Sequence, residues 1–340
     1  MAANLSPEYR EAETAFKTAR EPKERLQCLR DMLRTIPKHK GTEHLRADIK
    51  TRVKELTEEL ASAKKTGVRG GPPTVIRPEG AAQVALVGPP NTGKSSLHAH
   101  LTGSHAEIGP YPFATQYPLP GMLPVEDVAI QLIDQPSISP DHPIPWIGNA
   151  LQTADAAALV VDLSRPGCVE QVVQLHEILA ERRIVLSPRW PTDDGEAEDE
   201  DAVPDPFTTV LPTVLVAHKS DLVEDVAGEV EILEELAEIT YPTLATSLET
   251  GEGLEDLGPW LFDRIGVVRV YTKVPGLPAD MGRPFTVRSG QTVLDVATLV
   301  HRDIAASLAY ARIWGTGWFD GQQVGRDHPV RDGDVIELHT

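Results

Sequence analysis

Eight consecutive residues, Gly88 to Ser95, constrain this chain more than any other segment. They read GPPNTGKS and fit the phosphate-binding loop pattern G-x-x-x-x-G-K-[ST] at every fixed position. The mainly apolar run at 83–87 predicts a buried strand before the loop, and residues 95–101 can begin a helix after it. Backbone N–H groups of such a loop bind a β-phosphate, its lysine bridges the β- and γ-phosphates, and its serine binds Mg²⁺. The segment therefore predicts a nucleoside triphosphate site formed by Gly88, Pro89, Pro90, Asn91, Thr92, Gly93, Lys94, Ser95 and Ser96.

A second predicted strand brings a carboxylate to the same loop. Residues 128–133 form an apolar run that ends at Asp134. In phosphate-loop proteins, an acidic residue at the carboxyl end of a neighbouring strand holds Mg²⁺, usually through water. We therefore predict Mg²⁺ as the cofactor, with Ser95 and Asp134 among its ligands.

Two later segments predict which base is bound. Residues 218–221 read HKSD after an apolar run, which is similar to the guanine-reading signature Asn-Lys-x-Asp with histidine in the first place. An ionised aspartate at the fourth place accepts hydrogen bonds from N1–H and the N2 amino group of guanine, and adenine offers neither donor. The lysine can lay its aliphatic stem across the base. A Thr-Ser-Leu segment after a further strand resembles the loop that closes over guanine O6. The predicted base site therefore comprises His218, Lys219, Asp221, Ser247 and Leu248.

Composition limits the compartment and the partners. The chain has 340 residues, two cysteines (Cys28 and Cys168), no export signal at its start and no apolar run near the roughly 20 residues of a membrane span, so we expect a soluble cytoplasmic protein. Its net charge of −19 is concentrated in residues 71–265, where 8 Lys and Arg face 32 acids. Residues 1–70 carry 16 Lys and Arg against 11 acids. A polyanionic partner is therefore expected at the N-terminal or the C-terminal segment, unless the N-terminal charges serve solubility alone.

Hydrophobic periodicity and breaker residues predict the domain organisation. Residues 1–65 predict an α-helical hairpin with a break at 37–41, and the Gly- and Pro-rich residues 66–80 predict a linker. The second helix presents one apolar stripe, formed by Leu45, Ile49, Val53, Leu56 and Leu60.

The rest of the chain predicts two further domains. Residues 81–265 alternate strand-like and helical runs, which predicts an α/β domain with a mainly parallel sheet. Residues 190–206 interrupt it with eight acids and little to bury, so we expect a solvated acidic loop there. Residues 266–340 predict a small α+β, ubiquitin-like (β-grasp) domain.

In this order the motifs resemble the Obg/DRG group of TRAFAC-class GTPases, particularly those with a C-terminal TGS domain. The resemblance covers nearly the whole chain. Residues 36–43 (IPKHKGTE) are similar to the helical segment of DRG-like proteins, residues 111–115 (YPFAT) with Gly121 are similar to their switch I signature, and residues 270–336 look like a TGS domain. The resemblance implies a GTPase that engages ribosomes or RNA in translation, with Thr115 as a further Mg²⁺ ligand in the GTP state.

Three residues depart from the family's or from related patterns. Ser137 stands where the family has the glycine of Asp-x-Pro-Gly, and its Cβ restricts the backbone next to the γ-phosphate. His218 replaces asparagine, so guanine selectivity is expected to rest mainly on Asp221. Ile138 stands where Ras-like enzymes place a water-orienting glutamine, and an apolar side chain cannot position water. We therefore expect slow intrinsic hydrolysis.

Asn91 has two open interpretations. In several GTPases without the glutamine, an asparagine at this loop position helps to hold K⁺ beside the phosphates, so K⁺ is a candidate second cofactor. Alternatively, Asn91 bonds its own backbone and stabilises the loop. The predicted catalytic residues are Lys94, Thr115 and, in the first interpretation, Asn91.

Three functions fit these predictions to different degrees. The first is a GTP-driven switch on ribosomes or RNA, in which GTP–Mg²⁺ orders switch I (Gly109–Pro118) and the loop after Asp134. The second is a GTP-sensing regulator that binds a protein partner through its TGS domain and has weak or vestigial hydrolysis. A P-loop kinase is the least consistent of the three, because it has no need for Lys219 and Asp221.

Overall fold

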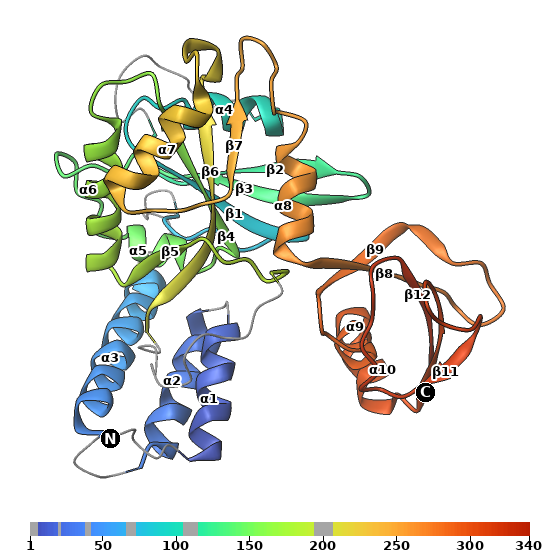
Figure 1. The fold of residues 1–340 in the computed structure, drawn as a ribbon. Coiled ribbons are helices and arrows are strands. Elements are labelled where there is room, and N and C mark those ends of the chain that lie inside the picture. The colour runs from blue at the N-terminus through green and yellow to red at the C-terminus, as the bar shows by residue number, and fades with distance from the viewer. Residues whose placement is uncertain (1–5, 20–21, 38–41, 66–72, 105–114, 194–206) are drawn as a thin grey trace. The chain divides into compact units, whose positions relative to one another are not determined.

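A computed structural model describes residues 6–19, 22–37, 42–65, 73–104, 115–193 and 207–340 (Figure 1). It divides into two compact units. One comprises residues 1–77 with 195–209, and the other comprises residues 78–194 with 210–340. Among the residues described, no helix combines the length and the apolar character that crossing a membrane requires.

The N-terminal unit is built from helices. Where one helical hairpin was expected, the described residues form three helices, which are α1 (Pro7–Thr18), α2 (Pro22–Thr35) and α3 (Glu43–Lys65). Proline lacks a backbone N–H and fits the first turn of a helix, so Pro22 begins a new helix instead of continuing α1. Ser6 caps α1, its hydroxyl accepting a hydrogen bond from the Tyr9 N–H (3.2 Å). The buried side chains that join the three helices are Tyr9, Phe16, Leu29, Met32, Ile36 and Ile49.

Aromatic residues are buried at both borders of the acidic segment, and Trp190 corrects the expectation that residues 190–206 bury little. Trp190 is buried in the core of the second unit, where its ring meets that of Trp260 edge-on at 4.9 Å. Phe207, directly after the segment, is buried in the helical unit between the Phe16 ring (6.0 Å) and the Arg52 guanidinium (4.7 Å). Residues 194–206 themselves lie outside the described part of the chain.

A seven-stranded, mainly parallel sheet forms the centre of the second unit, as predicted (Figure 1). The strand order is β2-β3-β1-β4-β6-β5, and β7 pairs with β6. The hairpin partner β2 runs antiparallel to β3, whereas β1, β3, β4, β6 and β7 pair in parallel. The strands are β1 (Ala82–Val87), β2 (Leu119–Val125), β3 (Val128–Asp134), β4 (Ala156–Asp162), β5 (Ile184–Ser187), β6 (Thr209–His218) and β7 (Thr243–Thr246).

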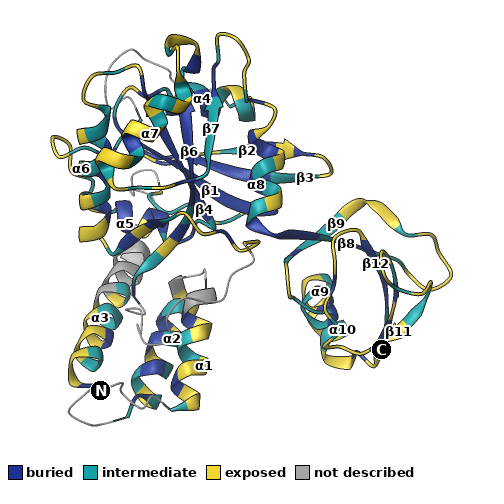
Figure 2. Cartoon of the chain, viewed as in Figure 1, coloured by how far each residue is buried: buried dark blue, intermediate teal, exposed yellow. Residues whose placement is uncertain are grey.

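Helices cover both faces of this sheet, and its central strands β1 and β4 are buried throughout (Figure 2). Alternate residues of β1 point to opposite faces, so Val84 and Leu86 enter one core while Ala85 and Val87 enter the other. One face packs against α4 (Lys94–Thr102) and α8 (Leu257–Ile265). The opposite face packs against α5 (Ile147–Leu151), α6 (Cys168–Glu181) and α7 (Val226–Ala237).

The C-terminal residues form the expected small α+β domain. Its sheet has the order β11-β10-β12-β8-β9, with β8 and β12 parallel and the other pairs antiparallel. Helix α9 (Val293–Val300) begins with a capping box between Thr292 and Asp295 and packs three residues into the core; α10 (Arg302–Ser307) follows. The strands are β8 (Val267–Thr272), β9 (Asp280–Arg288), β10 (Tyr310–Trp314), β11 (Gln322–Val324) and β12 (Asp334–His339).

Candidate nucleotide-binding site

The phosphate-loop residues connect β1 to α4, and close packing explains both fixed glycines. A Cβ on Gly88 would lie 2.4 Å from the Val160 carbonyl oxygen. Gly93 has φ +95°, and a Cβ there would lie 2.6 Å from the His218 ring. The Thr92 hydroxyl is buried and donates to the Pro89 carbonyl (3.3 Å), which helps to hold the loop closed on itself. Ser96 lies half-buried in the first turn of α4.

Lys94 is buried and its ammonium group faces the loop. Its Nζ donates to the carbonyls of Gly88 (3.1 Å) and Pro89 (2.9 Å) and to the Ser137 hydroxyl (3.1 Å). Burial lowers the pKa of Lys94 to about 8, and the Asp134 carboxylate opposes that shift. Ser137 was treated in the sequence as a stiffer substitute for glycine. In the structure its hydroxyl also holds the loop lysine, a contact that the backbone argument missed.

Three oxygen-bearing side chains converge next to Lys94. Ser95 Oγ donates to Asp134 Oδ2 (2.6 Å), and the Thr115 hydroxyl lies 2.9 Å from Ser95 Oγ and 3.2 Å from the same carboxylate oxygen. The other carboxylate oxygen, Asp134 Oδ1, is buried and has no hydrogen-bond partner among the residues that the structure describes. Unpaired buried carboxylate oxygen and neutral hydroxyls are ligands that suit a hard cation such as Mg²⁺. The three side chains therefore fit the predicted metal site.

Only part of the predicted switch I signature can be placed. Thr115 is described, whereas residues 111–114 lie outside the described part of the chain. Gly121, the following glycine of the signature, lies in β2, where a Cβ would come within 2.5 Å of the Thr102 hydroxyl on α4. Its small size thus lets the strand after switch I lie close to the helix that follows the phosphate loop.

The predicted base-reading residues lie together beyond the carboxyl ends of β6 and β7. Ser247 Oγ donates to Asp221 Oδ1 (2.5 Å) and accepts from the N–H groups of Glu249 and Thr250 (3.1 and 3.2 Å). The loop after β7 is thereby tied to the carboxylate that is predicted to read guanine. The Leu248 side chain packs against the sheet core, so only its backbone remains to meet a base.

Lys219 joins the base-reading segment to the phosphate loop. Its Nζ forms an ion pair with Asp162 at the end of β4 (2.7 Å) and donates to the Asn91 carbonyl (3.3 Å). The sequence interpretation gave Lys219 a role in covering the base and missed Asp162. An acidic residue directly after the apolar run at 156–161 was the available signal in the sequence, and it matches the way in which Asp134 was found.

His218, which stands in the place of the usual asparagine, is held by a hydrogen bond to the neighbouring strand and by packing against the phosphate loop. Its Nδ1 lies 2.9 Å from Thr246 Oγ1 across the paired strands, and its buried ring packs against Gly93. Burial, and then the nearby Lys219 charge, lower the pKa of His218. A neutral imidazole therefore links the base-reading segment to the phosphate loop by packing.

We expect this histidine to make stability depend on pH. The pKa of His218 in the folded protein lies below the ordinary 6.5, so the unfolded chain binds more protons than the folded one below pH 6.5. The contribution of the neutral, buried His218 to the free energy of unfolding is therefore present above pH 6.5. It is lost as the pH falls through the pKa of the folded protein. In urea unfolding between pH 7.5 and 5, His218→Asn should show a smaller loss of unfolding free energy than the natural chain. His100→Asn, at an exposed position of α4, is the control. Equal pH slopes for all three proteins would contradict this assignment.

The loop after Asp134 is held against the phosphate loop. The Ile138 N–H donates to the Gly88 carbonyl (3.2 Å), and the Gln135 N–H donates to the Leu86 carbonyl (3.2 Å). The Ile138 side chain is buried in the sheet core. An apolar side chain at this place offers no group that could orient water.

Asn91 has a conformational explanation that needs no ion. Its φ is +62°, in the left-handed region that asparagine tolerates better than other non-glycine residues. Its side chain is exposed at a pocket that also contacts Pro90. The K⁺ role of Asn91 stays a prediction.

Comparison with known proteins agrees with both domains. Residues 83–187 match the family of 50S ribosome-binding GTPases, and residues 268–340 match the TGS domain. A GTP-binding protein of Methanocaldococcus jannaschii is 26% identical to this chain in an alignment that covers 93% of this chain and 92% of the relative's length. Developmentally-regulated G-protein 2 of Arabidopsis thaliana is 26% identical over 91% of this chain and 88% of its own. Ribosome-interacting GTPase 1 of Saccharomyces cerevisiae is 25% identical over 93% of this chain and 98% of its own.

The order of the two matched domains and the similarity across nine-tenths of the chain agree with the geometry of the phosphate loop and with the predicted guanine-reading segment. This chain contains a P-loop GTPase domain and a C-terminal TGS domain, and DRG-type GTP-binding proteins are similar to it over about nine-tenths of its length.

Proposed function

We propose that this protein hydrolyses GTP slowly and acts as a GTP-driven switch on ribosomes or RNA. The observation that carries the proposal is the convergence of Lys94, Ser95, Thr115 and Asp134, which come from the phosphate loop, switch I and the end of β3. A triphosphate that engaged all four would order the two segments flanking the β2–β3 hairpin, and loss of the γ-phosphate would release them.

The same four residues divide the binding tasks. Ser95, Thr115 and Asp134 would hold Mg²⁺, which neutralises charge on the β- and γ-phosphate oxygens when it is bound. Lys94 would place its ammonium group between those phosphates, and the loop N–H groups would bind the β-phosphate. With Ile138 buried, no side chain at that position orients the attacking water, so turnover by the protein alone is expected to be slow.

Contacts at the tip of the β2–β3 hairpin support a link from the nucleotide to the TGS domain. The hairpin begins just after Thr115 and ends at Asp134, and Leu119 pairs with Asp134. At its turn, Asp127 pairs with Arg269 of β8 (3.0 Å) and accepts a hydrogen bond from the Tyr271 hydroxyl. A movement of the hairpin that followed the γ-phosphate would thus act directly on the first TGS strand.

A ribosome or RNA partner is supported by charge and by one relative. The basic surplus lies in residues 1–70, whereas residues 71–265 would be repelled by a polyanion. Within the basic segment, Lys50 and Lys54 are exposed on α3, and Arg52 lies against Phe207 and is less suited to contact phosphate. The yeast relative is named a ribosome-interacting GTPase.

Co-sedimentation with ribosomes tests this function. We expect more protein to sediment with a non-hydrolysable GTP analogue than with GDP, and the binding to fall by about tenfold or more between 50 and 200 mM salt, because contacts to phosphate release counterions. Lys50→Ala with Lys54→Ala should reduce both the binding and its salt slope. Binding that ignored salt and nucleotide would contradict the proposal, and salt-insensitive binding to a purified protein partner would favour the GTP-sensing regulator instead.

A further inference from the structure

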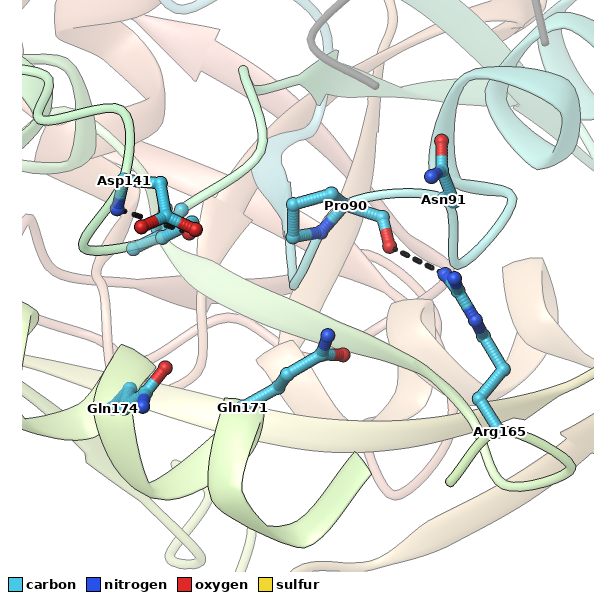
Figure 3. Close-up of a pocket in the computed structure, with 8 residues that line it drawn as sticks. Pro90, Asn91, Asp141, Arg165, Gln171 and Gln174 are labelled. Carbon is cyan, nitrogen blue, oxygen red and sulfur yellow. Dashed lines mark hydrogen bonds between the residues drawn. The ribbon is translucent and has the colours of Figure 1, made fainter. Parts of the chain in front are cut away.

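Arg165 extends from the loop between β4 and α6 to the outer side of the phosphate loop (Figure 3). Its Nη1 donates to the carbonyl oxygen of Pro90 at 3.0 Å, directly before Asn91. Its own backbone is fixed, because its N–H donates to the Asp162 carbonyl (3.3 Å) and its carbonyl accepts from the Cys168 N–H (3.3 Å). The half-buried side chain is thus anchored at its base and rests on the phosphate loop at its tip.

The guanidinium borders an open pocket of about 300 Å³. Four parts of the GTPase domain form this pocket, which are the phosphate loop, the loop that follows Asp134, the loop between β4 and α6 that carries Arg165, and the start of α6 (Figure 3). Arg165 is the cationic residue among those that line it. The lining residues are Pro90, Asn91, Ile138, Ser139, Asp141, Arg165, Gln171 and Gln174.

Within the described part of the chain, no carboxylate lies within ion-pair distance of the Arg165 guanidinium, although Asp141 lines the same pocket. This is unusual for its surroundings, since residues 71–265 contain only 8 Lys and Arg against 32 acids. The other two cations at the phosphate loop already have tasks. Lys94 bonds the loop carbonyls, and Lys219 pairs with Asp162.

GTP hydrolysis needs positive charge at this place. Water oxygen attacks the γ-phosphorus, the bond to the β–γ bridging oxygen breaks, its electron pair stays on GDP, and the water proton passes to phosphate or solvent. Negative charge therefore builds up on the bridging oxygen and on the γ-phosphate oxygens, and a positioned guanidinium stabilises it. In this protein the buried Ile138 cannot assist by orienting water.

We infer that Arg165 is the chain's own catalytic arginine. Rotation about its side-chain bonds moves the guanidinium past Pro90 to the γ-phosphate side of the loop, where it neutralises the transition-state charge. The inference rests on the proposed GTP hydrolysis. It assigns to the Arg165 guanidinium the positive charge near the γ-phosphate that the other interpretation assigns to K⁺ beside Asn91.

Single-turnover GTP hydrolysis by the full chain tests the inference with three variants. Arg165→Ala removes the side chain, and Arg165→Gln removes the charge but keeps a donor for the Pro90 carbonyl. Both should slow hydrolysis on the order of 10²–10³-fold, the usual effect of losing one transition-state donor. Their GDP affinity should stay within about twofold of the natural chain, and GDP with aluminium fluoride, which mimics the transition state, should bind them more weakly. Arg182→Ala, an exposed arginine at the end of α6, is the control and should behave as the natural chain.

Two further readouts separate catalysis from loop support. Added guanidinium ion should partly restore hydrolysis by Arg165→Ala, which a purely structural defect would not allow. The defect should be present in both potassium and sodium salts. A defect that occurs only in sodium salts would mean that potassium supplies the charge, and it would overturn the inference. Arg165 variants that hydrolyse GTP as fast as Arg182→Ala would also overturn it. So would variants whose GDP affinity falls by the same factor as their hydrolysis rate. If the natural chain itself fails to hydrolyse GTP, the proposed function falls; if it hydrolyses GTP and the variants match it, only the Arg165 assignment falls.

Discussion

Asp221→Asn should lower the affinity for GTP by about 10²–10³-fold, because each hydrogen bond to a charged group is worth about 1.5–3 kcal/mol and the carboxylate is positioned to accept two from guanine. Affinity for xanthosine triphosphate should rise at the same time. Xanthine carries a carbonyl oxygen where guanine has its amino group, and the asparagine amide can donate to that oxygen. The Ser247 hydroxyl that bonds Asp221 can also bond the asparagine side-chain oxygen, so the loop after β7 should keep its place.

Equilibrium titration with fluorescent derivatives of GTP, ATP and xanthosine triphosphate measures this change. The natural chain should bind GTP at least about a hundredfold more tightly than ATP. A site whose polar groups form hydrogen bonds with one base rejects another base that leaves those groups unpaired. Asp256→Asn, at an exposed position before α8, removes one negative charge from the same domain without touching the base site and should leave all three affinities unchanged. Equal binding of GTP and ATP by the natural chain would show that Asp221 does not read guanine.

The residues that the sequence located are those set by contiguous motifs. Gly88, Gly93 and Lys94 lie within one loop, and their roles follow from a spacing of a few residues. Asp134 and Asp221 lie farther along the chain, yet Asp134 ends the apolar strand β3 and Asp221 lies three residues after the end of β6. Because parallel strands end at one edge of the sheet, their positions could be inferred without long-range contacts.

The residues that the sequence missed depend on single contacts between distant segments. Asp162 meets Lys219 across 57 residues, and Arg165 meets Pro90 across 75. No periodicity records such a pair. Arg165 would pass for a surface loop residue, and the place of Asp162 after the apolar run at 156–161 does not show which lysine it meets. Phe207 was missed for the same reason, since its partner Phe16 belongs to α1.

Strand β2 was missed for a local reason. Its sequence, LPGMLPV, contains two prolines and a glycine, which ordinarily argue against a strand. It forms because it is an edge strand, where proline is tolerated, and because every one of its residues has a partner in β3. Cross-strand pairing therefore overrides the weak local propensity, and it creates the hairpin that joins Thr115 to Asp134.

Lys94→Met should abolish measurable GTP hydrolysis and weaken GTP binding by about 10²-fold or more, because the lysine supplies charge-assisted bonds to two phosphates. GDP should lose less, since it lacks the γ-phosphate. The nucleotide-free protein should remain as stable as the natural chain, because methionine fills the buried volume and removes the cost of burying an ammonium group whose pKa is already lowered to about 8. That gain offsets the donor lost by the Gly88 and Pro89 carbonyls.

Thermal unfolding with and without GTP–Mg²⁺ separates the two effects. A ligand raises the stability of the folded state in proportion to the logarithm of its concentration over its dissociation constant. The natural chain and Lys273→Met, which alters a lysine of the TGS domain that lies over Trp314, should both melt at higher temperature with GTP. Lys94→Met should show little or no rise at the same GTP concentration. A full GTP-induced rise in Lys94→Met would place the triphosphate somewhere other than this loop, and the roles given to Ser95, Thr115 and Asp134 would fall with it.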